Sequence, residues 1–300
     1  MSKVLQNKVA IVTGAGGGLG RAHALELARH GARVLVNDLG ADREGSNARA
    51  VVETIRRAGG EAHVNGGDVT QFEQMQAMVA QAMDAWGRVD ILVNNAGILR
   101  DKSFAKMSLD DFRLVLEVHV MGSVHCTKAV WETMREQGHG RIVMTTSSSG
   151  LYGSFGQANY GAAKMALVGL MQTLALEGIK HGIRVNCLAP SAATGMTEGI
   201  LSEGALAGLG PEKVSPGLIA LVDDDAPTRM ILLAGAGSFE SAHITMTQGI
   251  WVGDAGDAAE ALRGQLGRVQ DRRGEVVPAS GWEQYQHELT KAGLDDRVSA

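Results

Sequence analysis

The chain has 300 residues, and its formal net charge at pH 7 is −5. It carries no basic block and no apolar run long enough to cross a membrane, so we expect neither a nucleic-acid partner nor a membrane span. A hydrophobic content of 45% with 40 glycines and only 4% aromatic residues suits a parallel sheet with tight turns. Cys126 and Cys187 lie in apolar stretches and are expected to be reduced core residues, which favours a cytoplasmic location; no metal site is expected.

The first predicted element is a strand over residues 8–13, followed by a glycine-rich turn and a helix. The glycines at positions 14, 18 and 20 let the backbone approach a pyrophosphate, and the helix that follows offers free N–H groups to an anion. A second strand, residues 33–38, ends in Asp38. An acid at this distance from the glycines is expected to bind the adenosine ribose and to repel a 2′-phosphate, so NAD is preferred over NADP. The alternative is a solvated Asp at the end of a strand.

Helices and strands then alternate, with a helix at 43–58, a strand at 61–65, a helix at 71–86 and a strand at 90–93. Polar or small residues follow both strands. Asp68 and Val69 suit the edge of an adenine ring. The run Asn-Asn-Ala-Gly at 94–97 is expected beside the first turn, because parallel strands joined by right-handed crossovers bring their carboxyl ends together.

A serine, a tyrosine and a lysine stand where a buried strand, residues 141–146, passes into a long helix, residues 157–180. Ser147 lies at the carboxyl end of the strand, and Tyr160 and Lys164, four residues apart, share one face of the helix. An ammonium one turn from a phenol lowers the phenol's pKa from its ordinary value of about 10. A serine hydroxyl can hold an alcohol or carbonyl oxygen beside it. The pattern favours coupled proton transfer, and the alternative is an ordinary packed helix.

The remaining predicted elements are a helix at 108–135 and strands at 183–188 and 230–234. Alternation without an internal repeat predicts one α/β domain with a single doubly wound, Rossmann-like parallel sheet over residues 1–240, including a substrate loop at 191–216. A C-terminal extension, residues 241–300, is expected to pack on the same domain. In this extension we expect a strand at 242–249 and a helix at 282–291.

Taken together, these motifs resemble the short-chain dehydrogenase/reductase family over residues 8–196. The resemblance implies an NAD(P)-dependent oxidoreductase acting on CH–OH groups, and a homo-oligomer, dimer or tetramer, in which the long helices pair between subunits. The motifs are Thr13-Gly14 with Gly18 and Gly20, Asp68-Val69, Asn94 to Gly97, Ser147, and Tyr160 with Lys164.

The resemblance implies a role for each of these residues. Tyr160 is the acid/base, Ser147 orients the substrate oxygen, and Lys164 lowers the pKa of Tyr160 and binds the nicotinamide ribose. Asp38 holds the adenosine ribose. The other cofactor-binding residues implied are Gly14, Gly18, Leu19, Gly20, Asp68, Val69, Asn94, Ala96, Gly97, Pro190, Ala192 and Thr194.

Two positions depart from the family pattern. The fourth catalytic residue is usually an Asn in a V-N-x-x-G context, and residues 118–122 read Val-His-Val-Met-Gly, which puts His119 there. His119 substitutes for the Asn if that residue works through its backbone carbonyl, and alters the proton relay if it works through its side chain. A packing role is the alternative. Ser191 follows Pro190 where the family usually has Gly.

Within the family the likeness is to the (3R)-hydroxyacyl-CoA dehydrogenase units of the peroxisomal multifunctional enzymes, a group that also oxidises 17-hydroxysteroids. It rests on residues 36–40, 94–101, 118–122 and 152–160. The expected reaction is (3R)-hydroxyacyl-CoA to 3-oxoacyl-CoA. The alternatives are a hydroxysteroid or another hydrophobic alcohol as substrate and, more distantly, a non-catalytic dinucleotide-binding protein. Basic residues at the rim would suit CoA, and the candidates, which a solvated face explains equally, are Arg100, Lys102 and Lys106.

Overall fold

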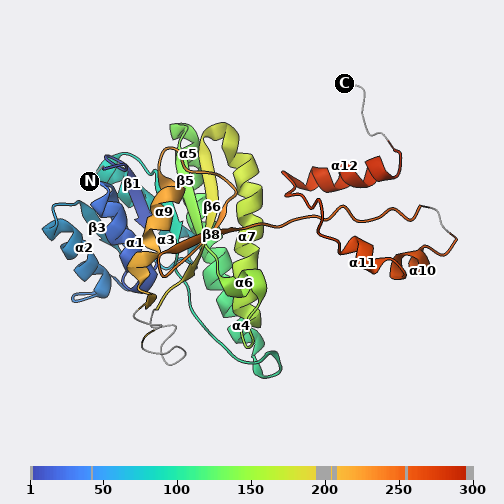
Figure 1. Ribbon diagram of the computed structural model, residues 1–300. Helices are drawn as coiled ribbons and strands as arrows, with labels where there is room; N and C mark the ends of the chain where they lie inside the picture. Colours follow the sequence, from blue (N-terminus) through green and yellow to red (C-terminus); the bar gives the residue numbers. More distant parts are fainter. Residues whose placement is uncertain (1–2, 42, 194–203, 205–207, 254–255, 295–300) are drawn as a thin grey trace. The chain divides into compact units, whose positions relative to one another are not determined.

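The computed structural model describes residues 3–41, 43–193, 204, 208–253 and 256–294. The chain divides into two compact units, Met1–Ser241 and Ala242–Ala300. The first unit contains one eight-stranded sheet with the strand order β3-β2-β1-β4-β5-β6-β7-β8 (Figure 1). The strands are β1 (Val9–Val12), β2 (Arg33–Asn37), β3 (Ala62–Asn65), β4 (Ile91–Asn94), β5 (Gly140–Thr145), β6 (Ile183–Ser191), β7 (Ile231–Gly235) and β8 (Ser238–Ala242).

All pairs from β3 to β7 are parallel, as the alternation of helices and strands predicts. The strand order reverses direction at β1, because the chain first builds outward to β3 and then returns to add β4 on the other side. In open parallel sheets a ligand crevice forms at this point, outside the carboxyl ends of the strands. The doubly wound, Rossmann-like α/β fold is confirmed.

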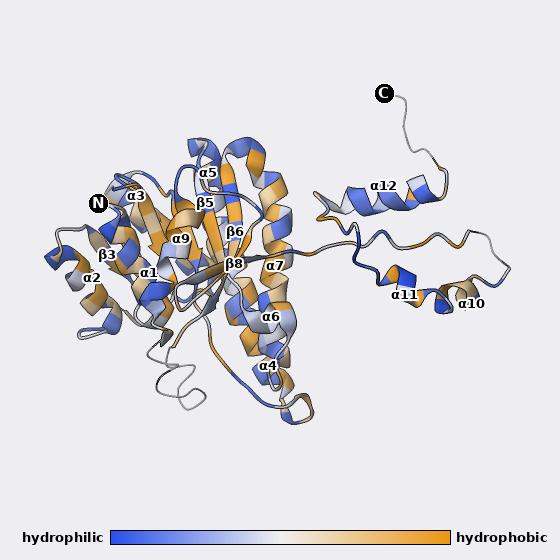
Figure 2. Cartoon of the chain, in the orientation of Figure 1, coloured by the Kyte–Doolittle hydropathy of each residue, from blue (hydrophilic) through white to orange (hydrophobic). Residues whose placement is uncertain are grey.

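Helices cover both faces of the sheet (Figure 1). Those of the first unit are α1 (Gly18–Arg29), α2 (Asn47–Arg57), α3 (Phe72–Trp86), α4 (Leu109–Leu116), α5 (Gly122–Gln137), α6 (Ser148–Tyr152), α7 (Ala158–Gly178) and α9 (Ser215–Val222). One core cluster joins α1, α2 and α9 to alternate strand residues such as Val12, Val36 and Val143. The intervening residues, such as Ile11 and Ile142, are also fully buried, so the strands are apolar on both faces (Figure 2).

The predicted helix at 108–135 is interrupted rather than regular. Helix α4 begins where Ser108 accepts a hydrogen bond from the N–H of Asp111 at 3.1 Å. It runs into a π-helical turn, Glu117–Met121, before α5 continues the same rod. Such a turn holds one more residue than an α-helical turn and often occurs at functional sites.

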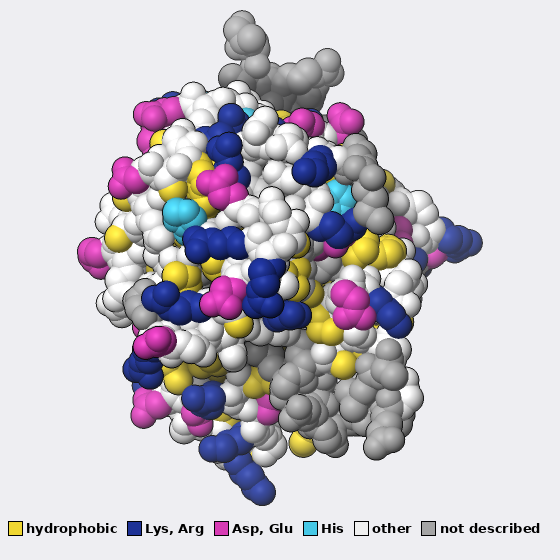
Figure 3. Space-filling model, turned by 90° about the vertical axis from the view of Figure 1, so that its left-hand side faces the viewer, with side chains coloured by type: hydrophobic (Ala, Val, Ile, Leu, Met, Phe, Trp, Pro, Cys, Tyr) yellow, Lys and Arg dark blue, Asp and Glu magenta, His cyan; other side chains and the backbone are white. Residues whose placement is uncertain are grey.

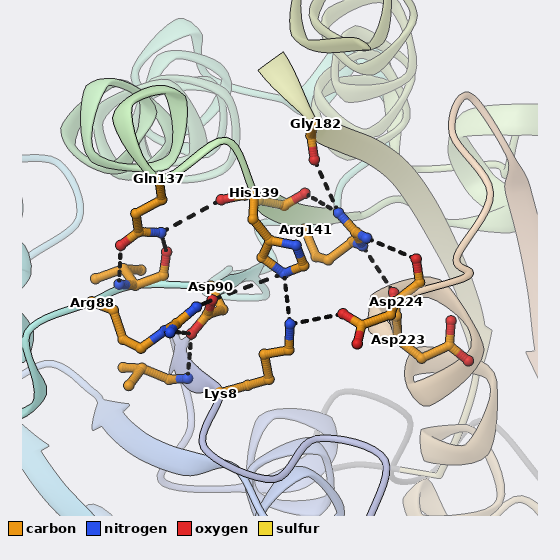
Figure 4. Close-up of polar contacts among 12 residues, drawn as sticks. Lys8, Arg88, Asp90, Gln137, His139, Arg141, Gly182, Asp223 and Asp224 are labelled. Atoms are coloured by element: carbon orange, nitrogen blue, oxygen red, sulfur yellow. Dashed lines mark hydrogen bonds and ion pairs between the residues drawn. The ribbon is translucent and has the colours of Figure 1, made fainter. Parts of the chain in front are cut away.

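The amino-terminal edge of the sheet is held by a polar cluster (Figure 4). The carboxylate of Asp90, which is fully buried, accepts hydrogen bonds from the N–H of Val9 at 2.8 Å and from the guanidinium of Arg88 at 2.7 and 2.8 Å. The guanidinium of Arg141 donates to the carbonyls of Asp223 at 2.9 Å and Asp224 at 3.0 Å, just after α9. This cluster ties β1, β4, β5 and the end of α9 together at the edge of the sheet opposite the carboxyl ends.

Charged side chains are scattered among apolar and other side chains over the face seen from the left-hand side of Figure 1 (Figure 3). Lys and Arg are interspersed there with Asp and Glu (Figure 3). The stretch Ala158–His181 has the length and apolar composition of a membrane-spanning helix, which is weak evidence because core helices pass the same test. Its helix, α7, packs against β5 and β6, which accounts for many of its apolar residues.

The second unit contains the helices α10 (Ala258–Arg263), α11 (Leu266–Val269) and α12 (Gly281–Lys291). The predicted helix at 282–291 is therefore confirmed. The predicted strand at 242–249 is wrong, because β8 ends at Ala242 and only an isolated bridge, Met246 to Val276, follows in that stretch. A single bridge forms there because none of the residues of the three described helices is buried, which leaves the unit without a core to align a longer strand.

Candidate active site

A cleft of about 720 Å³ opens at the carboxyl ends of the strands, where the strand order reverses. Residues from four separate predicted motifs meet in it, which is what the parallel topology requires. The residues of the predicted site that line it are Gly14, Gly18, Leu19, Gly20, Asp38, Asp68, Val69, Ala96, Gly97, His119, Tyr160, Lys164 and Pro190.

The glycine-rich turn forms the floor of the cleft. At Gly14 and Gly20, neighbouring atoms leave no space for a side chain. Gly14 has a φ of +62°, and a Cβ atom there would lie 2.8 Å from the Cα of Ala96. A Cβ atom on Gly20 would overlap the carbonyl oxygen of Gly14 and lie 2.6 Å from the side-chain nitrogen of Asn95. Helix α1 begins at Gly18, so its free N–H groups are presented at this floor.

Thr13 and Asn95 join the turn after β1 to the turn after β4. The hydroxyl oxygen of Thr13 accepts hydrogen bonds from the N–H groups of Asn95 and Ala96, both at 3.0 Å. The Asn95 side chain donates to the carbonyl of Thr13 at 2.9 Å and to that of Gly14 at 3.2 Å. These four bonds fix the distance between the two turns, and both turns line the cleft.

Asp38 lies at the end of β2 with its carboxylate at the cleft. Its Oδ2 atom accepts a hydrogen bond from the N–H of Gly16 at 2.8 Å. A Cβ atom on Gly16 would lie 2.9 Å from that oxygen, so a glycine is needed for this close approach. The second carboxylate oxygen is left for a ligand to reach from the cleft side.

Asp68 and Val69 form the wall after β3. The Oδ1 atom of Asp68 accepts hydrogen bonds from the N–H and the hydroxyl of Thr70, both at 2.9 Å. This local turn holds the carboxylate at the start of α3. Val69 is 8% exposed and packs against Gly122 of α5, where a Cβ atom would lie 2.8 Å from its methyl group.

Tyr160 and Lys164 line the other end of the cleft, and Ser147, which follows β5, does not line it but hydrogen-bonds to the Tyr160 side chain. Ser147 caps α6 by accepting a hydrogen bond from the N–H of Ser149 at 3.2 Å. The ammonium nitrogen of Lys164 lies 5.4 Å from the centre of the Tyr160 ring. Lys164 is 3% exposed, and its Nζ atom donates to the carbonyl of Thr145 at 2.6 Å. The helix face predicted from the spacing therefore points into the site.

The pKa of Tyr160 moves opposite to the prediction from the sequence. Burial raises the pKa of Tyr160, a hydrogen bond with the Ser147 side chain lowers it, and the nearby charge of Asp101 raises it. The predicted lowering by Lys164 fails because burial also brings the pKa of Lys164 down to about 7. Around neutral pH the lysine is then only partly charged, whereas the phenol keeps its proton.

His119 sits in the π-helical turn and is 2% exposed. Its Nε2 atom lies 3.0 Å from the N–H nitrogen of Ile98 and 2.8 Å from the carbonyl oxygen of the same residue. Its ring meets the ring of Tyr160 edge to face at 5.3 Å. A Cβ atom on Gly97 would overlap the imidazole, so the Asn-Asn-Ala-Gly turn and His119 fit together only with glycine at 97.

The imidazole of His119 is neutral at neutral pH, because burial and the charge of Lys164 lower its pKa to about 3. Its Nδ1 atom is buried and has no hydrogen-bond partner among the described residues. Its backbone carbonyl accepts a hydrogen bond from the hydroxyl of Ser123 at 2.6 Å. The carbonyl of His119 thus already accepts one hydrogen bond, whereas the Nδ1 atom of the ring has no partner among the described residues.

Two predicted cofactor-binding residues, Asn94 and Ala192, do not line the cleft. Asn94 is 3% exposed, and its side chain donates to the hydroxyl of Thr127 at 3.0 Å, away from the cleft that Asn95 lines. Ala192 packs against the core cluster. Thr194 and residues 195–203 of the predicted substrate loop lie outside the described residues.

The sequence interpretation missed Asn95 and assigned Thr13 only to a motif. The signal was available in the alternation of β4: if Asn94 ends the buried strand, the next residue points the other way. Of the three basic candidates for the rim, only Arg100 lines the cleft. Lys102 lies 3.5 Å from a carboxylate oxygen of Asp111, whose other oxygen is 3.8 Å from Arg100.

Comparison with known proteins agrees with this geometry. A family model described as short chain dehydrogenase matches residues 8–203. Peroxisomal multifunctional enzyme type 2 of Mus musculus is 50% identical over 214 residues, which are 70% of this chain and 29% of that protein. Peroxisomal hydratase-dehydrogenase-epimerase of Saccharomyces cerevisiae is 49% identical over 224 residues, 73% of this chain and 25% of that protein. The chain thus spans less than a third of these two relatives.

Among solved structures, 7α-hydroxysteroid dehydrogenase complexed with NADH and 7-oxo glycochenodeoxycholic acid superposes with a TM-score of 0.71. It is 31% identical, and the alignment covers 78% of this chain and 95% of that one.

Proposed function

This chain belongs to the short-chain dehydrogenase family, and from that premise we propose that it oxidises a (3R)-hydroxyacyl-CoA to the 3-oxoacyl-CoA with NAD. The observation that carries the proposal is the position of Tyr160 in the same cleft as the glycine-rich turn, with Lys164 and His119 against it. An oxidoreductase acting on CH–OH groups needs a proton acceptor beside the cofactor, and this arrangement supplies one. The thioester substrate is favoured by the names of the two relatives.

The residues present fit a dinucleotide. The floor at Gly14 and Gly20 excludes any side chain, and the N-terminus of α1 faces it, as a pyrophosphate requires. Asp38 would accept hydrogen bonds from the adenosine ribose, and its charge would repel a 2′-phosphate, which supports NAD over NADP. Asp68 and Val69 would flank the adenine, and Lys164 would contact the nicotinamide ribose.

A nicotinamide dinucleotide held by these residues would supply the acceptor for the hydride of the substrate carbon. The Ser147 hydroxyl positions the substrate oxygen beside Tyr160, and the phenolate of Tyr160 takes the hydroxyl proton. Lys164 stabilises that phenolate when it carries its own proton. His119 positions Ile98 through one hydrogen bond at Nε2 and supports the ring of Tyr160, so it replaces the Asn of the family as a positioning residue.

A second candidate substrate is a hydroxysteroid or another hydrophobic secondary alcohol. Ile98, Leu114 and Val118 give the substrate end of the cleft an apolar wall. The solved 7α-hydroxysteroid dehydrogenase adds support from the comparison.

The test is the initial rate of NADH formation with (3R)-hydroxyacyl-CoA, its 3S isomer, a 17β-hydroxysteroid and a simple secondary alcohol, each repeated with NADP. Turnover of the 3R thioester with NAD supports the proposal. Turnover of only the steroid or the simple alcohol moves the assignment to the second candidate. A non-catalytic dinucleotide-binding protein, the distant alternative, is eliminated by any turnover that Tyr160→Phe abolishes.

We also propose that the chain forms a homo-oligomer through its two long helical stretches, residues 108–135 and 157–180. Apolar residues on both are exposed, with 69% of Leu109, 48% of Leu176 and 54% of Ile179 accessible. Sedimentation of only a single-chain species would refute this.

A cytoplasmic location and packing of residues 241–300 on the first domain also stay predictions. Some relatives are named as peroxisomal, so fractionation of the source cell decides the location.

A further inference from the structure

The substrate end of the cleft combines an apolar wall with one strong positive charge. Ile98, Leu114 and Val118 line it together with Arg100. The other cation on the described wall is Lys164, which is 3% exposed, bonded to a backbone carbonyl, and has a pKa lowered to about 7. A guanidinium stays protonated in proteins, so Arg100 is the permanent positive charge on the described part of this wall.

The buried side-chain amide of Asn159 links the backbone of Arg100 to that of Tyr160. The side chain of Asn159, which is fully buried, donates to the carbonyl of Arg100 at 3.1 Å and accepts from the N–H of Tyr160 at 2.8 Å. The next residue, Asp101, accepts from the Gln157 side chain at 2.7 Å. The backbone of Arg100 is thereby fixed to the start of α7, the helix that carries Tyr160. The side chain of Arg100 therefore begins at a fixed position relative to the Tyr160 hydroxyl.

The guanidinium of Arg100 is only loosely paired with its surroundings. Its Nε atom is 3.8 Å from one oxygen of Asp111, and the other oxygen of that carboxylate is 3.5 Å from Lys102, so the two cations share one carboxylate. The neighbouring carboxylate of Asp101 accepts a hydrogen bond from Gln157. The Nη1 atom donates to the carbonyl of Leu99 at 2.8 Å. The side chain is 49% exposed, so it remains open to a ligand.

We propose that Arg100 binds an anionic group on an otherwise apolar substrate, and so selects charged substrates over neutral ones of the same shape. A guanidinium binds phosphate and carboxylate oxygens with paired hydrogen bonds, and the apolar wall holds the chain or ring that carries the reacting alcohol. The anion is a phosphate of CoA or the acidic group of a steroid acid. This inference rests on the proposed alcohol oxidation and specifies its substrate class.

The experiment compares substrates that share the reacting acyl group or ring system and differ in whether they carry an anionic group. One pair is a (3R)-hydroxyacyl thioester of CoA and the same acyl group on N-acetylcysteamine; the other is a hydroxysteroid acid and its methyl ester. The variants are Arg100→Met, which removes the charge but keeps much of the stem, and Arg100→Lys, which keeps the charge. The control is Arg113→Met, because Arg113 pairs with Asp110 at 3.2 Å on α4 and does not line the cleft.

We expect Arg100→Met to raise KM for the charged member of the active pair about tenfold, the loss of roughly one charge-assisted hydrogen bond, with kcat within about twofold. KM for the uncharged member should not change, Arg100→Lys should recover part of the loss, and Arg113→Met should behave like the wild type. The wild-type KM for the charged member should also rise with salt more steeply than that of Arg100→Met. Equal changes for both members, or none, overturn the inference.

Calorimetric titration with coenzyme A and with the steroid acid separates this inference from the proposed function. If the wild type oxidises none of the four substrates, the proposed function fails while the titration still tests Arg100. About tenfold weaker binding of either anion by Arg100→Met than by the wild type supports the inference. No binding of either anion to the wild type, or equal binding by both proteins, overturns it.

Discussion

The imidazole of His119 meets the ring of Tyr160 edge to face, with the ring centres 5.3 Å apart and the planes at 87°. The same imidazole lies within hydrogen-bond distance of both backbone groups of Ile98, on the opposite wall of the cleft. One side chain thus braces both the residue proposed to transfer the proton and the wall against which the substrate lies.

His119→Ala removes this brace. We expect kcat for alcohol oxidation to fall about 10- to 100-fold, whereas the Kd for NAD changes little, because the glycine-rich turn does not contact the ring. His119→Asn should keep more activity than His119→Ala, since an amide can also pair with the backbone of Ile98. Stopped-flow rates with NAD titrations check both variants. Equal activity of the alanine variant and the wild type would leave His119 a packing residue.

The pH profile tests the raised pKa of Tyr160. Oxidation needs the phenolate, so we expect kcat/KM to rise with pH from about pH 7 with no plateau below about pH 10, and reduction of the ketone to change little over this range. Ser147→Ala removes the hydrogen bond that lowers the pKa of Tyr160, so the rise should move to higher pH. Tyr160→Phe should lose at least about a hundredfold in kcat. A profile that is already flat at neutral pH would contradict the raised pKa.

Gly20→Ala places a methyl group against the carbonyl oxygen of Gly14, where no side chain fits. We expect a loss of about 2 kcal/mol or more in the free energy of unfolding, because the methyl group forces the turn and α1 apart. The matched control is Gly17→Ala: a Cβ atom there meets nothing within 4 Å, and its φ of −152° suits any residue. Denaturant unfolding compares the two. Similar stability of both variants would show that the turn yields freely.

Asp38→Asn removes a charge but keeps an oxygen for the N–H of Gly16. We expect kcat/KM with NADP to rise and kcat/KM with NAD to fall only a few-fold, because repulsion of the 2′-phosphate is lost while one hydrogen bond to the ribose is weakened. Steady-state rates with both cofactors measure the ratio. An unchanged ratio would assign the choice of cofactor to residues other than Asp38.

Acid should destabilise the fold through His23. This histidine is fully buried on α1, its Nδ1 atom lies 2.9 Å from the hydroxyl of Ser215, and burial lowers its pKa from 6.5 to about 4. Between these values the unfolded chain binds a proton that folded His23 does not, so the free energy of unfolding falls as pH falls through this range. The full effect is about 3 kcal/mol. Urea unfolding of His23→Gln from about pH 7 to about pH 4 should show a shallower loss than the wild type, and parallel curves would contradict this origin.

The single parallel sheet and the meeting of the motifs followed from the sequence, because a buried parallel sheet leaves a continuous apolar signal and right-handed crossovers bring the carboxyl ends of its strands together. The glycine-rich turn, Asp38 and Tyr160 were found for the same reason: each stands directly after a strand or on a regular helix face. Asn95 was missed because two identical residues stand side by side, and only the exact end of β4 shows which one faces the cleft.

The pKa of a side chain depends on how deeply it is buried, and burial could not be obtained from the spacing of residues along the sequence. The pattern Tyr160 to Lys164 suggested a lowered phenol pKa, but burial of the phenol raises that pKa, and burial lowers the pKa of Lys164 to about 7. The strand expected at 242–249 was wrong because a strand, too, depends on contacts that are distant in the sequence. Its residues alternate as a strand does, but a strand also needs a partner along its length, and a single bridge to Val276 is what forms.

The π-helical turn at Glu117–Met121 makes the site sensitive to chain length as well as to residue identity. Each residue advances a helix by about 100°, so the extra residue rotates α5 by that angle relative to α4. Deleting one residue would restore an unbroken helix with all other side chains unchanged, and would turn either His119 or the buried face of α5 out of position. Sequence alignments that allow a gap at this turn would therefore group proteins in which His119 lies differently relative to α5. The presence or absence of the extra residue would separate such proteins better than the identity of residue 119.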